Sequence, residues 1–264
     1  MSEKIKVPTV AEMVAAGETP EILFWVGCAG SFDDRAKKIT KAVVKLLHHA
    51  SIKFAVLGTE ESCTGDPAKR AGNEFTFMMQ AVQNIQVLDS YKIKRIVTAC
   101  PHCFNTIKNE YPELGGIYDV VHHSQLINTL LKEGRIKIKE GGDFKGKKIT
   151  FHDPCYLGRA NDVYEAPREL LSKLDSELVE MKNCKSKGLC CGAGGAQMFK
   201  EAEKGDIEIN VKRTEEVLEV KADIVATGCP FCNTMMTDGV KHFNKENDIE
   251  ILDIAEMIAN AADL

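Results

Sequence analysis

Two adjacent cysteines, Cys190 and Cys191, precede a glycine-rich run in the second half of this chain. Neighbouring thiols bond to one another with difficulty, so their pairing indicates sulfurs that share a bound group. Three distant cysteines complete the set: Cys155 upstream, and Cys229 and Cys232 downstream. Five thiolates at one place are suited to iron and sulfide, and we expect an iron–sulfur cluster there.

Three glycines follow the adjacent cysteines: Gly192, Gly194 and Gly195. A residue without a Cβ lets the backbone approach a bound group closely. We therefore expect these glycines to lie against the cluster or its substrate, and we expect Cys190 and Cys191 to take part in the chemistry.

The first half of the chain repeats the pattern with four cysteines: Cys28, Cys63, Cys100 and Cys103. Cys28 and Cys63 are separated by 34 residues, and Cys155 and Cys190 are separated by the same number. The shift between the halves is 127 residues for the first cysteine, 128 when Cys63 is matched with Cys191, and 129 for the closing pair. The chain is therefore predicted to be a tandem duplication.

Composition decides which cysteine chemistry is available. The 264 residues carry ten cysteines, yet residues 1–20 show no basic start, apolar run and small-residue cleavage site in succession. These residues therefore do not predict secretion, and we expect the chain to stay in a reducing compartment. Thiols in such a compartment bind metals or take part in redox catalysis more often than they form disulfides. The net charge of 34 minus 39, or -5, shows no basic block that would indicate nucleic acid. No apolar run reaches the roughly 18 residues that cross a bilayer.

Short apolar runs that precede most of these cysteines predict strands at residues 22–26, 54–57, 95–99, 118–122, 148–151, 178–181, 222–226 and 249–252. Helical patterns alternate with these strands. They lie at residues 31–50, after the loop that ends at residue 67 and up to about residue 88, onward from residue 101, and at residues 124–133, 167–174, 196–220, 230–241 and 255–262. This alternation predicts an α/β fold of two duplicated open-sheet, Rossmann-like halves, with mostly parallel strands and helices on both faces. The cysteines should meet where the strands end.

The expected organisation has four parts. Residues 1–20 form a polar, loosely held leader, with a short helix near residues 9–16. Residues 21–134 form the first cysteine-rich domain and residues 148–264 the second. A lysine- and glycine-rich linker, residues 135–147, joins them.

Both halves resemble the cysteine-rich (CCG) domain family of iron–sulfur proteins, over residues 22–242. That family includes the catalytic subunit of heterodisulfide reductase and the iron–sulfur subunits of glycolate oxidase and anaerobic glycerol-3-phosphate dehydrogenase. In heterodisulfide reductase the full pattern holds a non-cubane four-iron cluster. The resemblance implies this role for the second-half cysteines: Cys155, Cys190, Cys191, Cys229 and Cys232.

The first half departs from the family pattern, because Ser62 is expected at the place of the first of the two adjacent cysteines. Cys28, Cys63, Cys100 and Cys103 remain, which suffice for a four-iron cubane cluster. The same four thiolates also satisfy a tetrahedral zinc site. Spacing alone does not separate these two solutions.

The chain lacks the closely spaced ferredoxin run of cysteines that many relatives carry. The resemblance therefore implies a ferredoxin-type iron–sulfur subunit and a flavoprotein as partners. Three functions stay open: a heterodisulfide-reductase-like subunit that reduces a disulfide or similar two-electron acceptor, an electron conduit from a 2-hydroxy-acid or electron-transferring-flavoprotein dehydrogenase to quinone, and a zinc-stabilised scaffold. We expect a cytoplasmic protein, or one held at the inner membrane face through a quinone-reactive partner.

Several other residues have two interpretations each. His152 lies three residues before Cys155, where it either donates a proton to a leaving thiolate or is a structural histidine. Arg213 either holds an anionic substrate or lies on a solvated helix face, and the second is favoured. Cys184 lies outside both patterns and is expected to be a spare thiol.

Three further histidines are predicted to have no ligand role. His102, inside the Cys100–Cys103 segment, is expected to donate a hydrogen bond near the thiols or to be exposed at a helix start. His122 and His123 end a predicted strand and are expected to bind no metal.

Overall fold

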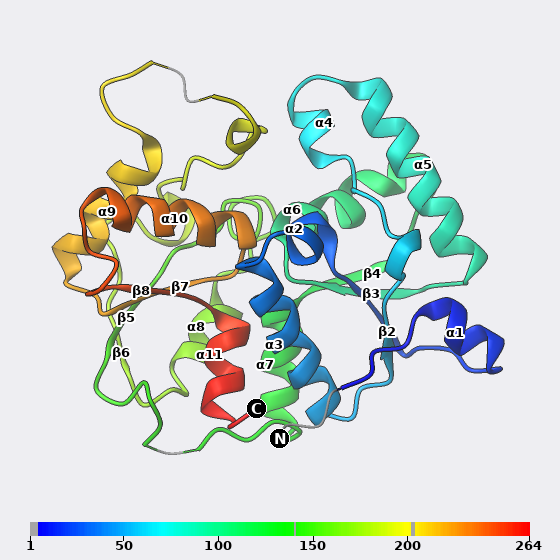
Figure 1. Cartoon of the computed structure of the whole chain (residues 1–264), viewed down its shortest axis with the longest axis horizontal. Coiled ribbons are helices and arrows are strands. Elements are labelled where there is room, and N and C mark those ends of the chain that lie inside the picture. The colour runs from blue at the N-terminus through cyan, green and yellow to red at the C-terminus, as the bar shows by residue number, and fades with distance from the viewer. Residues whose placement is uncertain (1–4, 140, 202–203) are drawn as a thin grey trace.

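A computed structural model describes residues 5–139, 141–201 and 204–264 of the chain (Figure 1). One sheet has the order β2-β1-β3-β4 and is built from β1 (Ile22–Trp25), β2 (Phe54–Ala55), β3 (Arg95–Thr98) and β4 (Asp119–His122). The other has the order β6-β5-β7-β8 and is built from β5 (Lys148–Phe151), β6 (Glu177–Leu178), β7 (Ile224–Thr227) and β8 (Glu250–Asp253). All strand pairs are parallel, which confirms the predicted α/β fold of two similar halves.

The strand order creates one special place in each sheet. From the central strand β1 the chain crosses to β2 on one side, and it then returns to β3 on the other side. The second sheet does the same around β5. Crevices at such switch points, beyond the carboxyl ends of the strands, are where open α/β sheets bind ligands. Cys28 and Cys100 follow β1 and β3, while Cys155 and Cys229 follow β5 and β7.

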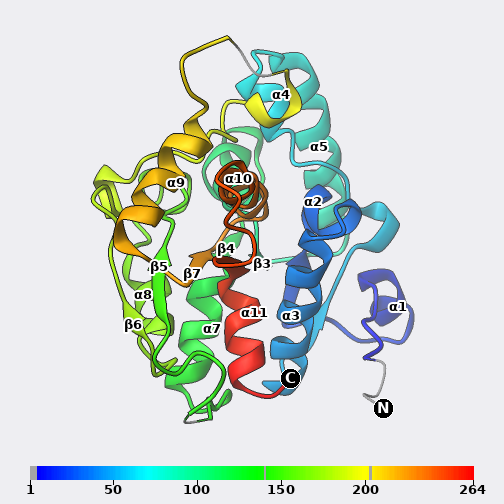
Figure 2. The ribbon, with the colours of Figure 1, turned by 60° about the vertical axis from the view of Figure 1, so that its left-hand side comes forward.

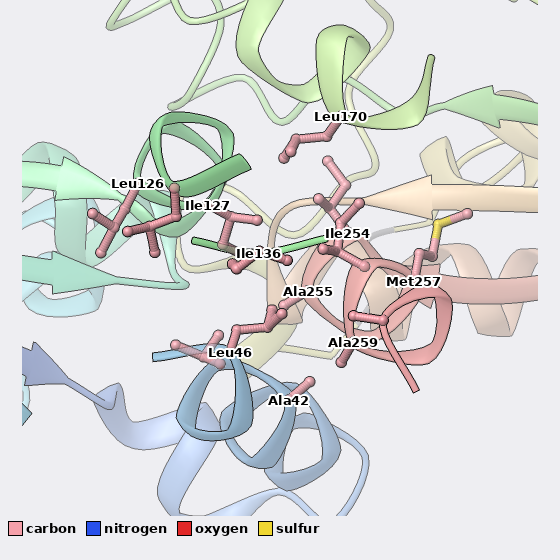
Figure 3. Close-up of a cluster of buried hydrophobic side chains, with 14 of the residues drawn as sticks. Ala42, Leu46, Leu126, Ile127, Ile136, Leu170, Ile254, Ala255, Met257 and Ala259 are labelled. Atoms are coloured by element: carbon pink, nitrogen blue, oxygen red, sulfur yellow. The ribbon is translucent and has the colours of Figure 1, made fainter. Parts of the chain in front are cut away.

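Four helices fill the space between the two sheets (Figures 1 and 2): α3 (Ala36–His49), α7 (His123–Lys132), α8 (Glu165–Leu171) and α11 (Ile254–Ala261). Helix α3 packs on α11, and α7 packs on α8, so each contact joins one half to the other. Figure 3 shows their side chains in one buried apolar cluster, with Leu46 beside Ala255 and Ile127 near Ile136. Both halves contribute side chains to this cluster, so they share a common core. Its burial stabilises the joined halves by about 25 cal/mol per Å² of apolar area.

Other helices cover the outer faces. On the first sheet, α5 (Glu74–Ser90) buries Phe77, Ala81 and Leu88 against strand residues. On the second, α9 (Ile209–Val220) and α10 (Pro230–His242) bury Val217 and Met236. Shorter helices lie after the strands: α2 (Gly27–Phe32), α4 (Asp66–Arg70) and α6 (Pro101–Asn105), which continues as a π-helical turn over Thr106–Glu110.

The predicted helix at residues 31–50 was wrong at its start. A separate helix, α2, begins directly after β1, so Cys28 lies in a first helical turn and Ser31 lies inside that helix. Helix α3 begins only at Ala36, whose N–H donates to Asp33 Oδ1 at 2.7 Å. The carboxylate thus satisfies an N-terminal amide and fixes the new start.

The predicted helix at residues 196–220 was also too long. Helix α9 covers only its last part, and Gln197–Phe199 is a single 3₁₀ turn. Ala196 adopts a left-handed backbone with φ of +61°, which is incompatible with continuing a helix. The helix expected to run to residue 88 is divided between α4 and α5 at Gly72, where φ is +81°.

The N-terminal segment is held more firmly than expected. Thr9 caps α1 (Val10–Ala15), accepting from the Glu12 N–H at 3.1 Å, and Thr9 also forms a parallel bridge with Val56. Val10 and Met13 are buried. The predicted short helix is present from Thr9 onward, and residues 9–15 are not loosely held, whereas residues 1–4 of the expected leader lie outside the described residues.

Candidate metal centres

Four cysteines of the first half gather beyond the ends of β1 and β3. Cys28 and Cys63 lie close enough for their side chains to shift each other's pKa, and so do Cys100 and Cys103. The two pairs lie close enough for the charge on Cys28 and Cys63 to act on Cys103. Gly27 borders the same place, since a Cβ there would lie 3.4 Å from Cys103 Sγ.

Five cysteines of the second half gather in the corresponding place. Cys190 lies close enough to Cys155 and Cys191 for their side chains to shift its pKa, and Cys191 and Cys229 act in the same way on Cys232. The Cys191 and Cys232 sulfurs are 3.4 Å apart. All these thiols are free, and Cys191, Cys229 and Cys232 are buried. The adjacent pair therefore faces the three remote cysteines, as the sequence predicts.

The two halves contain the same turn around one of their cysteines. Gly65 N–H donates to Cys63 Sγ at 3.4 Å, and Gly192 N–H donates to Cys190 Sγ at 3.3 Å. The backbone φ is +90° at Gly65 and +91° at Gly192, a conformation that favours glycine. Cys63 therefore corresponds to Cys190.

This correspondence changes which first-half residue replaces a cysteine. If Cys63 matches Cys190, then Thr64 takes the place of Cys191. The contacts agree, because Thr64 Oγ1 lies 3.9 Å from Cys103 Sγ, while Cys191 contacts Cys232. Ser62 Oγ instead donates to Asn84 Oδ1 at 2.8 Å. The expectation that Ser62 replaces the first of the two cysteines was wrong, because it matched Cys63 with Cys191, whereas the equal 34-residue spacing from the first cysteine already favours Cys190.

Electrostatics distinguish the matched cysteines from their neighbours. A hydrogen bond with Cys28, aided by the Gly65 N–H, lowers the pKa of Cys63 to about 7. Hydrogen bonds with Cys155 and Cys191, and with the Gly192 N–H, hold the pKa of Cys190 well below its usual value. The hydrogen bond with Cys190 raises the pKa of Cys191 to about 12. Among the second-half thiols, Cys190 is thus the one that loses its proton most easily.

The two sets of thiols touch each other. Cys100 and Cys229 lie close enough across the boundary between the halves for their side chains to shift each other's pKa. They are the N-cap residues of α6 and α10, each followed by a proline in the first turn. Helix N-termini carry partial positive charge and favour thiolates. The two sets of thiols are therefore neighbours that meet at this pair of cysteines.

Aromatic and charged side chains surround this contact. His102 is buried, its ring centre lies 4.6 Å from that of Tyr156, and its Nδ1 is 2.8 Å from Asp66 Oδ2. Burial alone would lower the pKa of His102, but the hydrogen bond with Asp66 and the nearby Cys100 raise it overall. Asp66 also binds Arg70. The interpretation of His102 as exposed was wrong, because the second half covers it.

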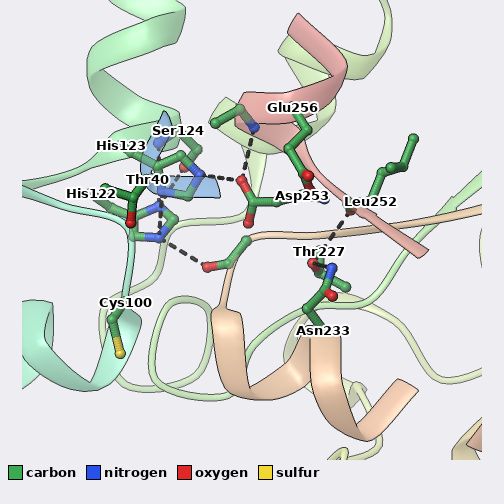
Figure 4. Close-up of polar contacts among 12 residues, drawn as sticks. Thr40, Cys100, His122, His123, Ser124, Thr227, Asn233, Leu252, Asp253 and Glu256 are labelled. Carbon is green, nitrogen blue, oxygen red and sulfur yellow. Dashed lines mark hydrogen bonds and ion pairs between the residues drawn. The ribbon is translucent and has the colours of Figure 1, made fainter. Parts of the chain in front are cut away.

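His122 and His123 form a buried network between the halves (Figure 4). His122 Nε2 lies 3.0 Å from the Gly228 carbonyl oxygen and 3.1 Å from His123 Nδ1. His123 Nε2 lies 2.9 Å from Asp253 Oδ1. Burial lowers the pKa of His122 far below its usual value, and the neighbouring His123 lowers it further. These rings connect the end of β4 to both β8 and the segment before Cys229.

His152 and Arg213 lie behind the second set of thiols. A ring nitrogen of His152 and the sulfurs of Cys191 and Cys232 all lie within 4.8 Å of one another. Arg213 is fully buried, so the favoured interpretation as a solvated residue was wrong. Its helix, α9, packs on α10, which shields that face of α9 from solvent. Cys184 is apart from the other thiols and interacts with Glu180 and Arg168.

The fold and the site define a duplicated α/β protein with two adjoining thiol-lined centres. Residues 22–108 and 149–237 match the model of the CCG cysteine-rich domain. The chain therefore belongs to the cysteine-rich domain family.

Several curated proteins are similar over nearly the whole chain. The probable iron-sulfur-binding oxidoreductase FadF of Bacillus subtilis is 43% identical, over 97% of this chain and 36% of its own length. The EtfAB:quinone oxidoreductase of Syntrophomonas wolfei is 41% identical, over 93% and 35%. A subunit of the dihydromethanophenazine:CoB--CoM heterodisulfide reductase of Methanosarcina barkeri is 32% identical, over 99% and 64%. The chain thus spans between about a third and two thirds of these relatives.

A solved structure shares the fold. It is a hypothetical protein from Helicobacter pylori, with a TM-score of 0.58 and 9% identity, covering 91% of this chain and 48% of its own. Within the described ranges, no helix combines the length and the apolar character needed to cross a bilayer.

Proposed function

We propose that this chain is the iron–sulfur subunit of a heterodisulfide-reductase-like oxidoreductase complex. It passes electrons from a ferredoxin-type or flavoprotein partner to a disulfide, or to a similar two-electron acceptor, at the second-half centre. The observation that carries this proposal is the convergence of five thiols on the start of α10, in contact with the four-thiol set at Cys100. The family and the names of the relatives support it.

The donor set fits the proposed cofactors. Five converging thiols suit a non-cubane four-iron cluster in the second half, and four suit a cubane cluster, or zinc, in the first. Such clusters supply one-electron storage and release. The chain contributes two helix N-termini and the N–H groups of Gly65 and Gly192, which all stabilise negative sulfur. The closeness of Cys100 and Cys229 supports electron exchange between the two proposed centres.

A hollow beside the second centre offers the acceptor a way in. A cavity of about 440 Å³ lies between the glycine loop and α10, and Gly192, Met198, Ile209 and Met235 line it. Reduction of a disulfide takes two electrons and two protons and yields two thiols. Cys190 and Cys191 directly precede Gly192, which lines this cavity.

A second function is an electron conduit to quinone. The similarity to the EtfAB:quinone oxidoreductase of Syntrophomonas wolfei favours it. In this case quinone, rather than a disulfide, takes two electrons and two protons, and the chain needs no bound disulfide.

Metal analysis tests the cofactor assignment. Anaerobically purified protein should contain iron, show broad visible absorption, and give low-temperature EPR signals after reduction. Cys191→Ser should remove the second-half signal together with its iron, whereas the matched control Cys184→Ser should leave both unchanged. A colourless protein with zinc in both centres would contradict the proposal.

The acceptor is tested separately. Chemically reduced protein is mixed with a soluble disulfide or with a short-chain quinone, and reoxidation is followed by its visible absorption. Faster reoxidation by the disulfide supports the first function. Faster reoxidation by the quinone, with none by the disulfide, supports the conduit.

A further inference from the structure

His152 stands directly behind the second set of thiols. It follows the last residue of β5, it is 1% exposed, and one of its ring nitrogens lies within 4.8 Å of the Cys191 and Cys232 sulfurs. By distance alone the ring qualifies as a metal ligand. The hydrogen bond that the ring accepts from Arg213 argues against this role.

Arg213 fixes the position of the His152 proton. Arg213 Nε–H donates to His152 Nδ1 at 3.1 Å. A guanidinium only donates, so Nδ1 must present its lone pair and the ring proton must lie on Nε2. Arg213 is itself held by the Asn183 carbonyl oxygen and by Glu216, both at 2.7 Å. The other ring nitrogen, Nε2, therefore carries the hydrogen, on a ring that lies within reach of the second-half thiols.

The surroundings keep the ring neutral. A ring protonated at Nδ1 as well as at Nε2 could not accept the hydrogen bond from the Arg213 guanidinium, which itself carries a positive charge. A neutral ring with its proton on Nε2 has no lone pair left for iron. It also has no spare proton to give to a leaving thiolate, because loss of the Nε2 proton would leave a buried anion.

The first half has a comparable donor. Trp25 stands three residues before Cys28, as His152 stands three residues before Cys155. Trp25 is fully buried in the cluster that contains Cys100 and Cys103, and within the described residues its indole N–H has no hydrogen-bond partner. An indole N–H only donates and never ligates a metal. Both halves thus place an N–H donor at this position.

We propose that His152 is a positioning residue that donates its Nε2–H to a sulfur of the second-half cluster, with Arg213 holding it in that tautomer. A hydrogen bond to sulfur stabilises the reduced, more negative cluster and so raises its reduction potential. This inference rests on the proposed presence of that cluster.

Two substitutions at His152 separate this role from a purely structural one. In His152→Asn, the side-chain oxygen replaces Nδ1 and still accepts from Arg213, but no group reaches the place of Nε2. In His152→Gln, the amide N–H reaches that place while the acceptor for Arg213 is lost. The midpoint potential of each cluster is measured by redox titration followed by EPR.

We expect the second-half potential to become more negative in His152→Asn and to stay near the wild-type value in His152→Gln. The first-half potential should not move in either variant. The reverse order, or an unchanged potential in His152→Asn with full iron content, would overturn the inference while leaving the proposed function intact.

Pulsed EPR of the reduced wild-type protein gives a second readout. A weak nitrogen coupling with an exchangeable proton, both absent in His152→Asn, supports the hydrogen bond. A strong nitrogen coupling would show direct ligation and overturn the inference. Absence of iron in the wild-type protein would instead contradict the proposed function itself.

Discussion

At the scale of single residues, one side chain distinguishes the two centres. Cys63 and Cys190 occupy equivalent turns in the two halves, and each Sγ accepts a hydrogen bond from the N–H of the glycine two residues later. The next residue is Thr64 in the first half and Cys191 in the second. The first centre therefore has a hydroxyl where the second has its fifth thiol.

Thr64→Cys should give the first half a five-thiol set. The new sulfur would lie beside Cys103, as Cys191 lies beside Cys232. We expect the first-half EPR signal to become similar to that of the second half, without loss of iron. Ser62→Cys is the matched control and should leave the signal unchanged, because Ser62 points to Asn84. A change in the control variant alone would show instead that Cys63 corresponds to Cys191 and Ser62 to Cys190.

At the scale of elements, tight turns between strand and helix position the thiols. Gly65 ends the turn after Cys63 and begins α4, and a Cβ there would lie 2.8 Å from the Phe77 ring and 3.3 Å from its backbone. Gly72 ends the same helix with a similar positive φ, but a Cβ there would meet nothing within 4 Å. The two glycines thus share a left-handed backbone, which would strain any other residue, and differ in packing.

Gly65→Ala should destabilise the protein more than Gly72→Ala. Each substitution costs about 1–2 kcal/mol, because alanine disfavours a left-handed backbone. Gly65→Ala adds about 1–3 kcal/mol for the clash with α5. Urea unfolding followed by circular dichroism measures both, and iron content should fall only in Gly65→Ala. Equal losses in the two variants would show that Phe77 moves aside freely.

At the scale of the whole molecule, the halves are joined by the central helices and by the buried His122–His123–Asp253 network (Figure 4). His122 caps α7 and approaches the Gly228 carbonyl oxygen of the other half. Its pKa is lowered well below the ordinary value, first by burial and then by His123. The joint between the halves should therefore be sensitive to acid.

The sign of this pH dependence follows from proton counting. Below about pH 6.5 the unfolded chain protonates His122, whereas the folded protein does not, so the free energy of unfolding falls as the pH falls. The loss between pH 6.5 and pH 5 is roughly 2 kcal/mol, at about 1.4 kcal/mol per pH unit. In His122→Asn, which can still cap α7, this loss should disappear.

Chemical unfolding at pH 7 and pH 5 measures the effect. His49→Asn is the control, because His49 is exposed near the end of α3 and lies outside the network. The control should keep the wild-type pH dependence. An equal slope in His122→Asn and in the wild type would show that other groups cause the acid sensitivity.

Much of this protein can be predicted from the sequence. The apolar runs before Cys28, Cys100, Cys155 and Cys229 predict buried parallel strands, because only short, fully buried strands combine such runs with following turns. Parallel strands bring their carboxyl ends to one edge, so the gathering of remote cysteines follows from local pattern and the general properties of open sheets.

Only the tertiary structure decided the rest. The spacing of the cysteines left the match of Cys63 open between Cys190 and Cys191, whereas the hydrogen bond from Gly65 to Cys63 shows that Thr64 takes the place of Cys191. The contact between Cys100 and Cys229, and the orientation of His152 by Arg213, join residues from separate elements. Local sequence sets which backbone a segment prefers, but packing of one element on another sets which side chains meet, and those contacts have no signal in the spacing of residues.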